Sequence, residues 1–361
     1  MITLFGATGY TGRRVAHALA QTGQTFRIAG RSPEKLAALA GQFTPPPPIV
    51  VASAQAPEPL FTPRRMSPTG RLAGPPLLIN CAGPFTDLGL PVAQAAALHG
   101  SRYLDVSNEL GFVFRLRQFD ALARTTGAAL VPAGGFEVAI ADALVSALTR
   151  AVGALERVDV VYALPAEAIS YGTRLAGLRT YATSWWTYRG GRWVGRLPGG
   201  EVRAGDFAGR PYRAISFPSA ETVTVPAHST VRDVQAWLAL APRWARPVAA
   251  LMPFIDVLLR TPLGALTALS FRYLAPPPPE ALLKSARFVV QIEAHRGAQR
   301  WVRTARGRDP YALTAAIVAY AAPRLLAAEF SRRGVLAPAL AFADDEFLAW
   351  LTTQGVTVTA G

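Results

Sequence analysis

Three glycines near the start of the chain have the spacing best suited to chemistry. Gly6, Gly9 and Gly12 form a G-x-x-G-x-x-G turn, preceded by an apolar run at 2–5 and followed by helical spacing at 13–21. A helix that begins in such a turn presents backbone N–H groups and its positive dipole end to a phosphate. We therefore expect a dinucleotide site rather than a glycine turn without a ligand. The predicted cofactor contacts in this turn are Gly6, Thr8, Gly9, Tyr10, Thr11 and Gly12.

The next predicted strand, 26–29, is followed by a residue that can select between the two nicotinamide cofactors. A carboxylate about 20 residues after the glycines holds the ribose 2′-hydroxyl of NAD, whereas an arginine accommodates the 2′-phosphate of NADP. Arg31 follows this strand, and the first carboxylate is Glu34. Ser32 is a suitable helix N-cap, and Lys35 lies close enough in sequence to assist. Unless Arg31 is only a solvated loop residue, the pattern favours NADP over NAD, with Arg31, Ser32 and Lys35 as contacts.

Strands and helices continue to alternate after this point. The pattern predicts further strands at 49–52, 77–80, 102–106 and 128–131, and helices at 33–43 and 87–99, the latter capped by Asp87. Such alternation is typical of an α/β fold with a doubly wound parallel sheet. Ligands bind these sheets at the carboxyl ends of the strands, and a small-residue turn follows the strand at 77–80. The predicted cofactor contacts in that turn are Cys81, Ala82, Gly83 and Pro84.

The composition narrows the class of protein. With 361 residues, 51% of them hydrophobic and 17% charged, the chain is long enough for two domains and is expected to be globular. Cys81 is the only cysteine, so a disulfide within the chain is excluded and a reducing compartment is expected. The sequence begins directly with a strand pattern, which favours a cytoplasmic protein over a secreted one. A net charge of +14 predicts attraction to polyanions or to an anionic membrane surface.

Several motifs together resemble a known family. In chain order they are GATGYTG at 6–12, AGRS at 29–32, NCAGPF at 80–85, YLDVSNE at 103–109 and the glycine turn before Phe136. This series resembles the saccharopine dehydrogenase-like oxidoreductases. It is more similar to the branch that includes trans-acting enoyl reductases of lipid biosynthesis.

The resemblance extends into the second half of the chain, with two departures. Ser170–Thr173 is similar to a serine-glycine-threonine segment of that branch, and 309–314 and 334–338 are similar to its C-terminal helix and the following loop. Asn108 stands where glycine is commoner, and Glu137 begins a segment that replaces an Asp-Ser-Val-Pro pattern. These departures bear on the substrate more than on the fold.

The resemblance implies that the chain consists of three parts. They are a Rossmann NADP-binding domain at 1–136, a substrate or dimerisation domain at 137–308, and C-terminal helices at 309–361 that return to the first domain. The residue pattern agrees with an α+β second domain, through which a homodimer could form. It predicts strands at 157–164 and 286–294 and helices at 312–330 and 344–352.

No complete motif identifies a catalytic residue. Neither lysine has a tyrosine four residues before it, which excludes the short-chain dehydrogenase mechanism, and the four histidines have no metal-site spacing. Asp105 and Glu109, which follow a predicted strand, are the best candidates to relay a proton or position a substrate. The alternative is that Asp105 caps a turn and Glu109 begins a helix. Tyr171 and Thr173, in the segment shared with the family branch, are candidates for substrate contact.

The apolar stretch 234–274 predicts contact with lipid. Arginines, one aspartate and prolines interrupt it, so no uncharged run reaches the length of a spanning helix. Trp237, Trp244 and Phe254 among leucines and arginines are typical of short helices that lie peripherally at a membrane interface or line an apolar tunnel. Ordinary buried helices are the alternative. The arginines at 296–308 are expected to be a solvated face, because no nucleic-acid-binding motif accompanies them.

Two classes of function fit this sequence. One is an NADP-dependent reductase of a double bond in a hydrophobic acyl or isoprenoid-type substrate, with imine reduction of the saccharopine type as an alternative chemistry. The other is a non-catalytic, membrane-associated protein that binds NADP. The apolar second domain argues against imine reduction, because an amino-acid substrate needs polar groups that hold its carboxylates.

Overall fold

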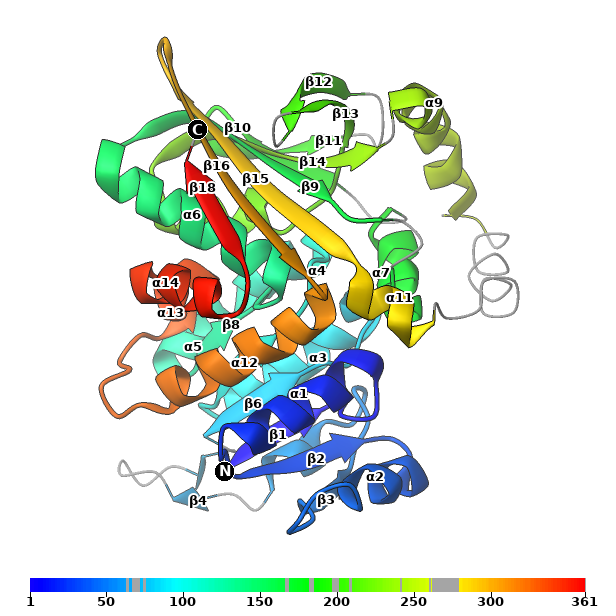
Figure 1. Cartoon of the computed structure of the whole chain (residues 1–361). Coiled ribbons are helices and arrows are strands. Elements are labelled where there is room, and N and C mark those ends of the chain that lie inside the picture. The colour runs from blue at the N-terminus through cyan, green and yellow to red at the C-terminus, as the bar shows by residue number, and fades with distance from the viewer. Residues whose placement is uncertain are drawn as a thin grey trace. The chain divides into compact units, whose positions relative to one another are not determined.

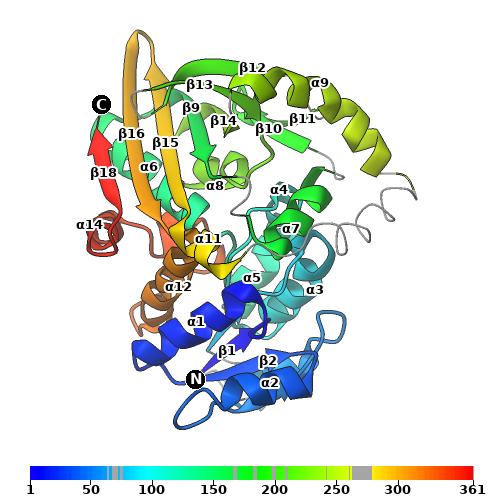
Figure 2. The same ribbon diagram turned by 45° about the vertical axis from the view of Figure 1, so that its right-hand side comes forward.

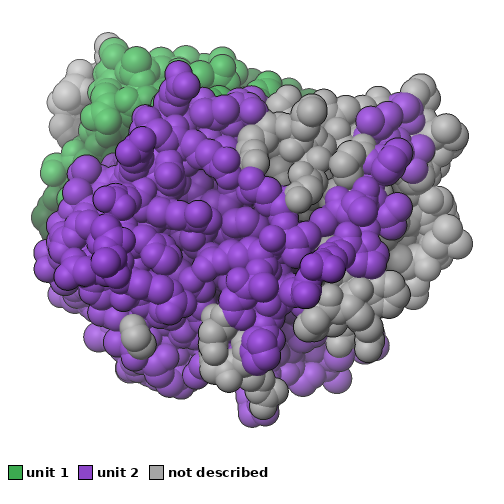
Figure 3. Space-filling model, turned by 90° about the horizontal axis from the view of Figure 1, so that it is seen from above, with its two compact units in different colours: residues 1–107, 112–136, 311–342 green, residues 108–111, 137–310, 343–361 purple. Residues whose placement is uncertain are grey.

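The chain folds into two compact units, each with its own sheet (Figures 1 and 3). Unit 1 comprises 1–107, 112–136 and 311–342, and unit 2 comprises 108–111, 137–310 and 343–361. The C-terminal segment is therefore divided between the units. The computed structural model describes residues 1–62, 65–66, 72–73, 76–165, 169–181, 185–196, 201–207, 210–240, 242–259, 261 and 279–360.

Unit 1 contains the doubly wound sheet that the sequence predicts, with parallel pairing throughout. Across the sheet the strands are β17 (Gly334–Val335), β8 (Ala129–Val131), β7 (Arg102–Asp105), β6 (Leu77–Asn80), β1 (Ile2–Phe5), β2 (Phe26–Gly30) and β3 (Ile49–Val51). β1, β2, β6 and β8 are buried along their whole length, as is usual for parallel strands covered on both faces. The strand order reverses between β1 and β6, which is the point where such sheets bind ligands.

Helices cover both faces of this sheet. α1 and α12 lie on one face, and α3 and α5 lie on the other (Figures 1 and 2). The main helices are α1 (Tyr10–Gln21), α2 (Pro33–Ala40), α3 (Phe85–Leu98), α4 (Leu110–Leu116), α5 (Asp120–Thr126) and α12 (Pro310–Leu326). The shorter elements are η1 (Glu58–Phe61), β4 (Arg65–Met66), β5 (Leu72–Ala73), η2 (Arg117–Phe119) and α13 (Pro338–Ala341).

Two local expectations in this unit are corrected. Asp87 does not cap α3, because Pro84 occupies the N-cap position and Asp87 lies in the first turn, where its charge complements the helix dipole. Residues 334–338 are not only a loop, because Gly334 and Val335 form β17 beside β8. The Val335 N–H donates to Asp120 Oδ1 at 2.8 Å, and a Cβ at Gly334 would lie 2.4 Å from the same oxygen. Only glycine fits there.

The C-terminal helix α12 returns to the first sheet, as predicted. The ring of Tyr311 meets the ring of Tyr10 edge-on, with 5.1 Å between centroids. Thr314 Oγ1 accepts a hydrogen bond from the Phe136 N–H at 3.2 Å. These contacts tie α12 to the start of α1 and to the loop after β8.

Unit 2 is built on a nine-stranded mixed sheet. Its main path runs β11 (Arg192–Arg196), β10 (Trp185–Arg189), β14 (Val231–Leu240), β9 (Leu155–Ala163), β15 (Arg287–Arg296), β16 (Gln299–Arg308) and β18 (Thr357–Ala360). The hairpin of β12 (Val202–Phe207) and β13 (Arg210–Ser216) joins it through the β13–β14 pairing. β9 and β14 pair in parallel, and the other pairs are antiparallel.

One face of this second sheet is covered by α6 and α8. Tyr162 of β9 donates to Glu221 of α8, and Thr224 of α8 donates to Asp142 of α6 at 2.7 Å. The helices of the unit are α6 (Phe136–Val152), α7 (Tyr171–Tyr181), α8 (Glu221–His228), α9 (Pro242–Leu259), α11 (Glu280–Ser285) and α14 (Asp345–Thr353).

The expectation of helices throughout 234–274 is wrong at its start. Val234 to Leu240 belong to β14, and Trp237 is only 4% exposed, so it does not lie at a membrane interface. Residues 234–237 of β14 are buried in succession, so both faces of this part of the strand are covered and its apolar run lacks the alternation of a half-exposed strand. The helix α9 follows, whereas 262–274 lie outside the described residues. In the described part of the chain, no helix combines the length and hydrophobicity needed to cross a bilayer.

Candidate functional site

The glycine turn joins β1 to α1 at the carboxyl end of β1. The N–H groups of Gly6 and Ala7 donate to the Ala29 carbonyl of β2 at 3.0 and 3.2 Å. Gly9 is the N-cap of α1 and has no side chain to cap the first turn. The helix therefore presents its positive dipole end at the edge where the parallel strands end, which is the arrangement that binds a pyrophosphate.

The three glycine positions of the turn differ in how much space they leave for a side chain. A Cβ at Gly6, whose φ is +75°, would lie 2.6 Å from the Ala82 nitrogen, and a Cβ at Gly12 would lie 2.2 Å from the Gly6 oxygen. These two glycines are required by the fold itself. A Cβ at Gly9 meets just the Gly6 oxygen, at 3.3 Å, among the described atoms within 4 Å. The fold has little need of glycine there, whereas a phosphate approaching the helix needs the space.

Arg31 lies directly after β2, at the same edge of the sheet. Its side chain is exposed and forms no hydrogen bond or ion pair with any residue that the structure describes. The nearby carboxylate of Glu34 accepts a hydrogen bond from Ser32 Oγ at 2.7 Å, which lowers the pKa of Glu34. Ser32 Oγ also accepts from the Lys35 N–H at 3.3 Å as the predicted N-cap of α2. A guanidinium is thus available for a 2′-phosphate, while Glu34 is held within the first turn of α2.

The turn after β6 lies against the glycine turn. The Cys81 N–H donates to the Phe5 carbonyl at 2.8 Å, and the Ala82 N–H donates to Asn80 Oδ1 at 2.9 Å. The close approach of Gly6 to Ala82 brings these two predicted cofactor segments together. Desolvation, with a smaller effect of Asp105, raises the pKa of the Cys81 thiol to about 12, so the thiol is not a nucleophile at neutral pH.

Asp105 ends β7 and accepts hydrogen bonds from the loops that follow β7 and β8. Its Oδ1 accepts hydrogen bonds from the Ser107 N–H at 2.9 Å, the Ser107 hydroxyl at 2.6 Å and the Ala133 N–H at 2.9 Å. Ala133 has a φ of +59°, so this bond holds a strained residue of the loop after β8. Burial raises the pKa of Asp105, against the opposing effect of the bonds from Ser107 and Ala133. The arrangement matches the turn-capping alternative, and a catalytic role for Asp105 stays a prediction.

Substitutions at Asp105 separate these two roles. Asp105→Ala is expected to lower the free energy of unfolding by about 3 kcal/mol, because three donors lose their acceptor. Asp105→Asn keeps the accepting oxygen and removes the buried charge, so its stability should be close to that of the wild type at neutral pH.

The raised pKa also fixes how this comparison depends on pH. A carboxyl whose pKa is higher in the folded state contributes stability at low pH, and that contribution is lost as the pH rises from about 4 towards the folded-state pKa. In denaturant unfolding, the free energy of unfolding of Asp105→Asn should therefore increase relative to that of the wild type as the pH rises. A folded but inactive Asp105→Asn protein would instead support proton relay.

The remaining candidates for a role in the reaction, Glu109, Tyr171 and Thr173, belong to unit 2. Glu109 directly precedes α4 and is 3% exposed, consistent with a residue that leads into a helix. Ser170 Oγ accepts from the Thr173 N–H at 3.2 Å and lies 2.9 Å from Thr173 Oγ1, so Thr173 takes part in the start of α7. The side chain of Tyr171 lies outside the described residues. Roles for Glu109, Tyr171 and Thr173 in the reaction stay predictions.

The two departures from the family pattern are bonded to each other. Asn108 Nδ2 donates to Glu137 Oε2 at 2.7 Å, and Asn108 Oδ1 accepts from Ser219 Oγ at 2.8 Å and the Ala220 N–H at 2.9 Å. Burial raises the pKa of Glu137, and the bond from Asn108 lowers it. The sequence analysis identifies both residues as departures from the family pattern. It does not predict the bond between them, because 29 residues separate them and no helix or strand spacing relates them.

A buried acidic cluster under the second sheet has no counterpart in the sequence predictions. Glu221 and Asp142 are fully buried. Burial raises the pKa of Glu221 well above its usual range, and the charges of Asp142 and Glu137 raise it further. His228 Nε2 lies 3.4 Å from Asp142 Oδ1. The raised pKa of Glu221 favours its neutral form, which reduces the repulsion between the carboxyl groups of this cluster.

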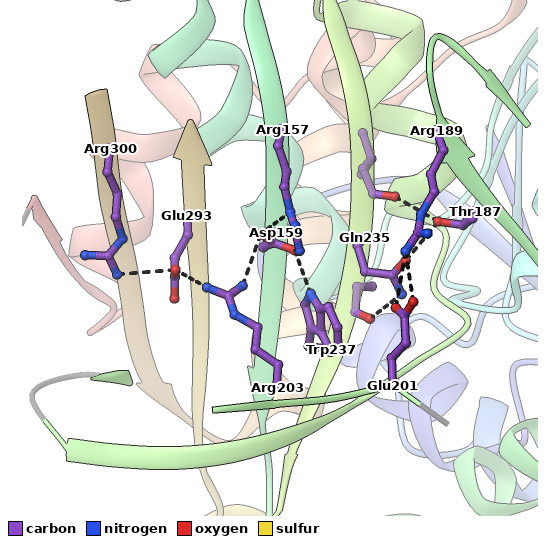
Figure 4. Close-up of polar contacts among 12 residues, drawn as sticks. Arg157, Asp159, Thr187, Arg189, Glu201, Arg203, Gln235, Trp237, Glu293 and Arg300 are labelled. Carbon is purple, nitrogen blue, oxygen red and sulfur yellow. Dashed lines mark hydrogen bonds and ion pairs between the residues drawn. The ribbon is translucent and has the colours of Figure 1, made fainter. Parts of the chain in front are cut away.

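The opposite face of the same sheet carries a network of arginines and carboxylates (Figure 4). Asp159 and Glu293 are directly opposite each other on β9 and β15 and are each 1% exposed. Arg203 of β12 reaches both, lying 3.1 Å from Asp159 Oδ2 and pairing with Glu293 Oε2. Arg157 binds Asp159 through two nitrogens, at 2.7 and 2.9 Å, and Arg300 lies 3.3 Å from Glu293. Arg300 thus belongs to this network, and its strand β16 pairs on both sides, with β15 and β18.

Comparisons with known proteins identify relatives of part of the chain. Residues 2–131 match the model of the saccharopine dehydrogenase NADP-binding domain. A trans-acting enoyl reductase of Mycobacterium tuberculosis (strain ATCC 25618 / H37Rv) is 34% identical over 155 residues, and one of Mycobacterium leprae (strain TN) is 36% identical over 157 residues. These alignments cover 41% and 42% of this chain and 35% and 36% of the relatives. The chain therefore matches about a third of the length of these curated relatives.

Solved structures with a similar arrangement are distant in sequence. An engineered D-amino acid dehydrogenase bound to NADP+ has 13% identity and a TM-score of 0.45, covering 93% of this chain and 92% of its own. A myo-inositol dehydrogenase from Corynebacterium glutamicum has 11% identity and a TM-score of 0.41, covering 90% and 87%. At this level of similarity neither bears on function.

The family match, the parallel sheet and the glycine turn agree with one another. The match spans the strands from β1 to β8, and the glycine turn lies within it. The predicted resemblance and the preference for NADP are confirmed at the level of the domain. Residues 2–131 thus have the sequence and the fold of a saccharopine dehydrogenase NADP-binding domain.

Proposed function

We propose that the protein uses NADPH to reduce a carbon–carbon double bond in a hydrophobic acyl or isoprenoid-type substrate. The observation that carries this proposal is the similarity of part of the chain to trans-acting enoyl reductases, at 34% and 36% identity. The glycine turn and Arg31 support NADPH as the reductant, because a reductase of this class needs the phosphorylated cofactor held at the carboxyl edge of the sheet.

The chain supplies binding and positioning in this proposal. Bound NADPH supplies the hydride. The amides at the start of α1 hold the pyrophosphate, and Arg31 holds the 2′-phosphate. Asp105, through Ser107 and Ala133, fixes the loops that follow β7 and β8 at the same edge of the sheet.

Imine reduction of an amino-acid substrate is less well supported. Such a substrate has carboxylates that need cationic partners. Three arginines on the face of the second sheet opposite α6 and α8 are already paired with Asp159 and Glu293. These arginines, Arg157, Arg203 and Arg300, are therefore poor candidates for binding a second set of carboxylates.

A substrate panel tests the proposal. Purified protein with NADPH should consume the cofactor when given 2-enoyl thioesters of increasing chain length, and mass spectrometry should find a product heavier by two hydrogens. Turnover of a 2-oxo acid with an amine, but not of the enoyl series, would favour the imine alternative. NADPH binding without turnover of any substrate in either series would favour a non-catalytic NADP-binding protein.

Arg31 should set the choice of cofactor. Arg31→Ala is expected to weaken NADPH binding by about 10- to 100-fold, because a charge-assisted contact to the 2′-phosphate is lost. NADH lacks that phosphate, so its affinity should change by less than about threefold. Titration of both cofactors by calorimetry gives the ratio of the two effects directly. An equal loss for both cofactors would assign Arg31 a purely structural role.

A further inference from the structure

The helix α9 of unit 2 carries large apolar side chains that face outward. Phe254 is 74% exposed, Val257 64%, Leu251 55% and Leu258 42%. Spacings of three and four residues place them on one face of the helix. Most large apolar side chains of a water-soluble surface occur singly, so four on one helix face require an explanation.

The inward face of α9 already has its partners. Ala249, which is 4% exposed, packs against Ile215 of β13, and Val248 packs against the same small cluster. Figure 2 shows α9 lying beside the β12–β13 hairpin. The outward set, formed by Leu251, Phe254, Val257 and Leu258, does not belong to this cluster.

The charges around these residues favour an anionic surface. Arg243 and Arg246 precede the apolar positions, Arg260 follows them, and Asp256 is the only acidic residue of α9. Arg246 is exposed. An exposed arginine on an apolar helix, as Arg246 is, can reach lipid phosphates while the apolar side chains enter the acyl region. The whole chain carries a net charge of +14, which adds long-range attraction to an anionic membrane.

We propose that the outward face of α9, formed by Leu251, Phe254, Val257 and Leu258, docks the protein on an anionic phospholipid surface. The helix lies in the plane of the interface, because it is not apolar enough to cross the bilayer. A protein partner fits less well, because a specific interface takes about 20–30 residues on each side, and this set has far fewer. Docking would bring the protein to the phase in which a hydrophobic acyl substrate dissolves, which goes beyond the proposed reaction.

Vesicle co-sedimentation tests the proposal. Full-length protein should bind vesicles of phosphatidylcholine with phosphatidylglycerol, and should bind pure phosphatidylcholine vesicles more weakly. Phe254→Glu is expected to weaken binding to the mixed vesicles by at least about tenfold, because it replaces the most exposed apolar side chain of the set with a charge. High salt should weaken the electrostatic part.

Leu98→Glu is the matched control. Leu98 ends α3 in unit 1, is 58% exposed and gains the same charge, so this variant should bind vesicles like the wild type. Thermal unfolding and NADPH titration of both variants separate docking from folding and from the proposed reaction. Equal binding by Phe254→Glu and the wild type, or no binding by the wild type, overturns the proposal. So does a dimer that Phe254→Glu dissociates, because a second copy would then cover this face.

Discussion

Gly9→Ala is expected to lower NADPH affinity by about 100-fold while leaving the fold intact. The added methyl group would lie 3.3 Å from the Gly6 oxygen, so that carbonyl has to move by only a few tenths of an ångström. The backbone at Gly9 has a φ of −72° and a ψ of 168°, which alanine adopts without strain. The same methyl group occupies the space in front of α1 and prevents the pyrophosphate from reaching two or more amides, each such bond being worth about 1.5–3 kcal/mol.

Calorimetric titration with NADPH and a thermal unfolding curve measure the two effects separately. Gly41→Ala is the control, because Gly41 ends α2 with a φ of −63° and an added Cβ would meet nothing closer than 3.6 Å. That variant should bind NADPH like the wild type. Gly12→Ala should instead destabilise the fold itself, because its Cβ would lie 2.2 Å from the Gly6 oxygen. Unchanged NADPH affinity in a folded Gly9→Ala protein would contradict the assignment of the turn.

The first sheet and its cofactor edge could be predicted because their signals are local. Glycine turns, buried apolar runs and a serine N-cap each lie within a dozen residues, and parallel strands place their carboxyl ends at one edge. The helix at 33–43 was predicted too long, since α2 ends at Ala40. The two-residue strand β17 was missed because so short a segment has no periodicity to detect.

The second unit was harder to predict because its signals join distant residues. Asn108 and Ser219 are 111 positions apart, and Arg203 and Glu293 are 90 apart. Neither pair follows a helix or strand spacing. β14 was mistaken for helix because an apolar strand covered on both faces has no alternation, and a short apolar run fits either element. A buried carboxylate opposite another carboxylate can be recognised only when the strand register is known.

That carboxylate pair makes the loss of Arg203 costly for the stability of unit 2. Asp159 and Glu293 face each other across β9 and β15, and like charges placed directly opposite are destabilising. The Arg203 side chain is only 19% exposed and contacts both carboxylates. Its guanidinium also lies 5.9 Å from the ring of Trp237, whose Nε1 donates to Asp159 Oδ1 at 2.7 Å. Removing this cation leaves Arg157 and Arg300, which are about half exposed, as the remaining counter-charges.

Arg203→Met is expected to lower the free energy of unfolding by about 3 kcal/mol, as measured by denaturant titration. Arg189→Met is the control, because Arg189 pairs with Glu201 at 3.0 Å but is 49% exposed, and loss of such a pair should cost less than about 1 kcal/mol. Adding Glu293→Gln to Arg203→Met removes the like-charge contact and should restore part of the loss. If Arg203→Met costs no more than Arg189→Met, or Glu293→Gln restores nothing, Arg203 does not stabilise the sheet by separating the two buried carboxylates.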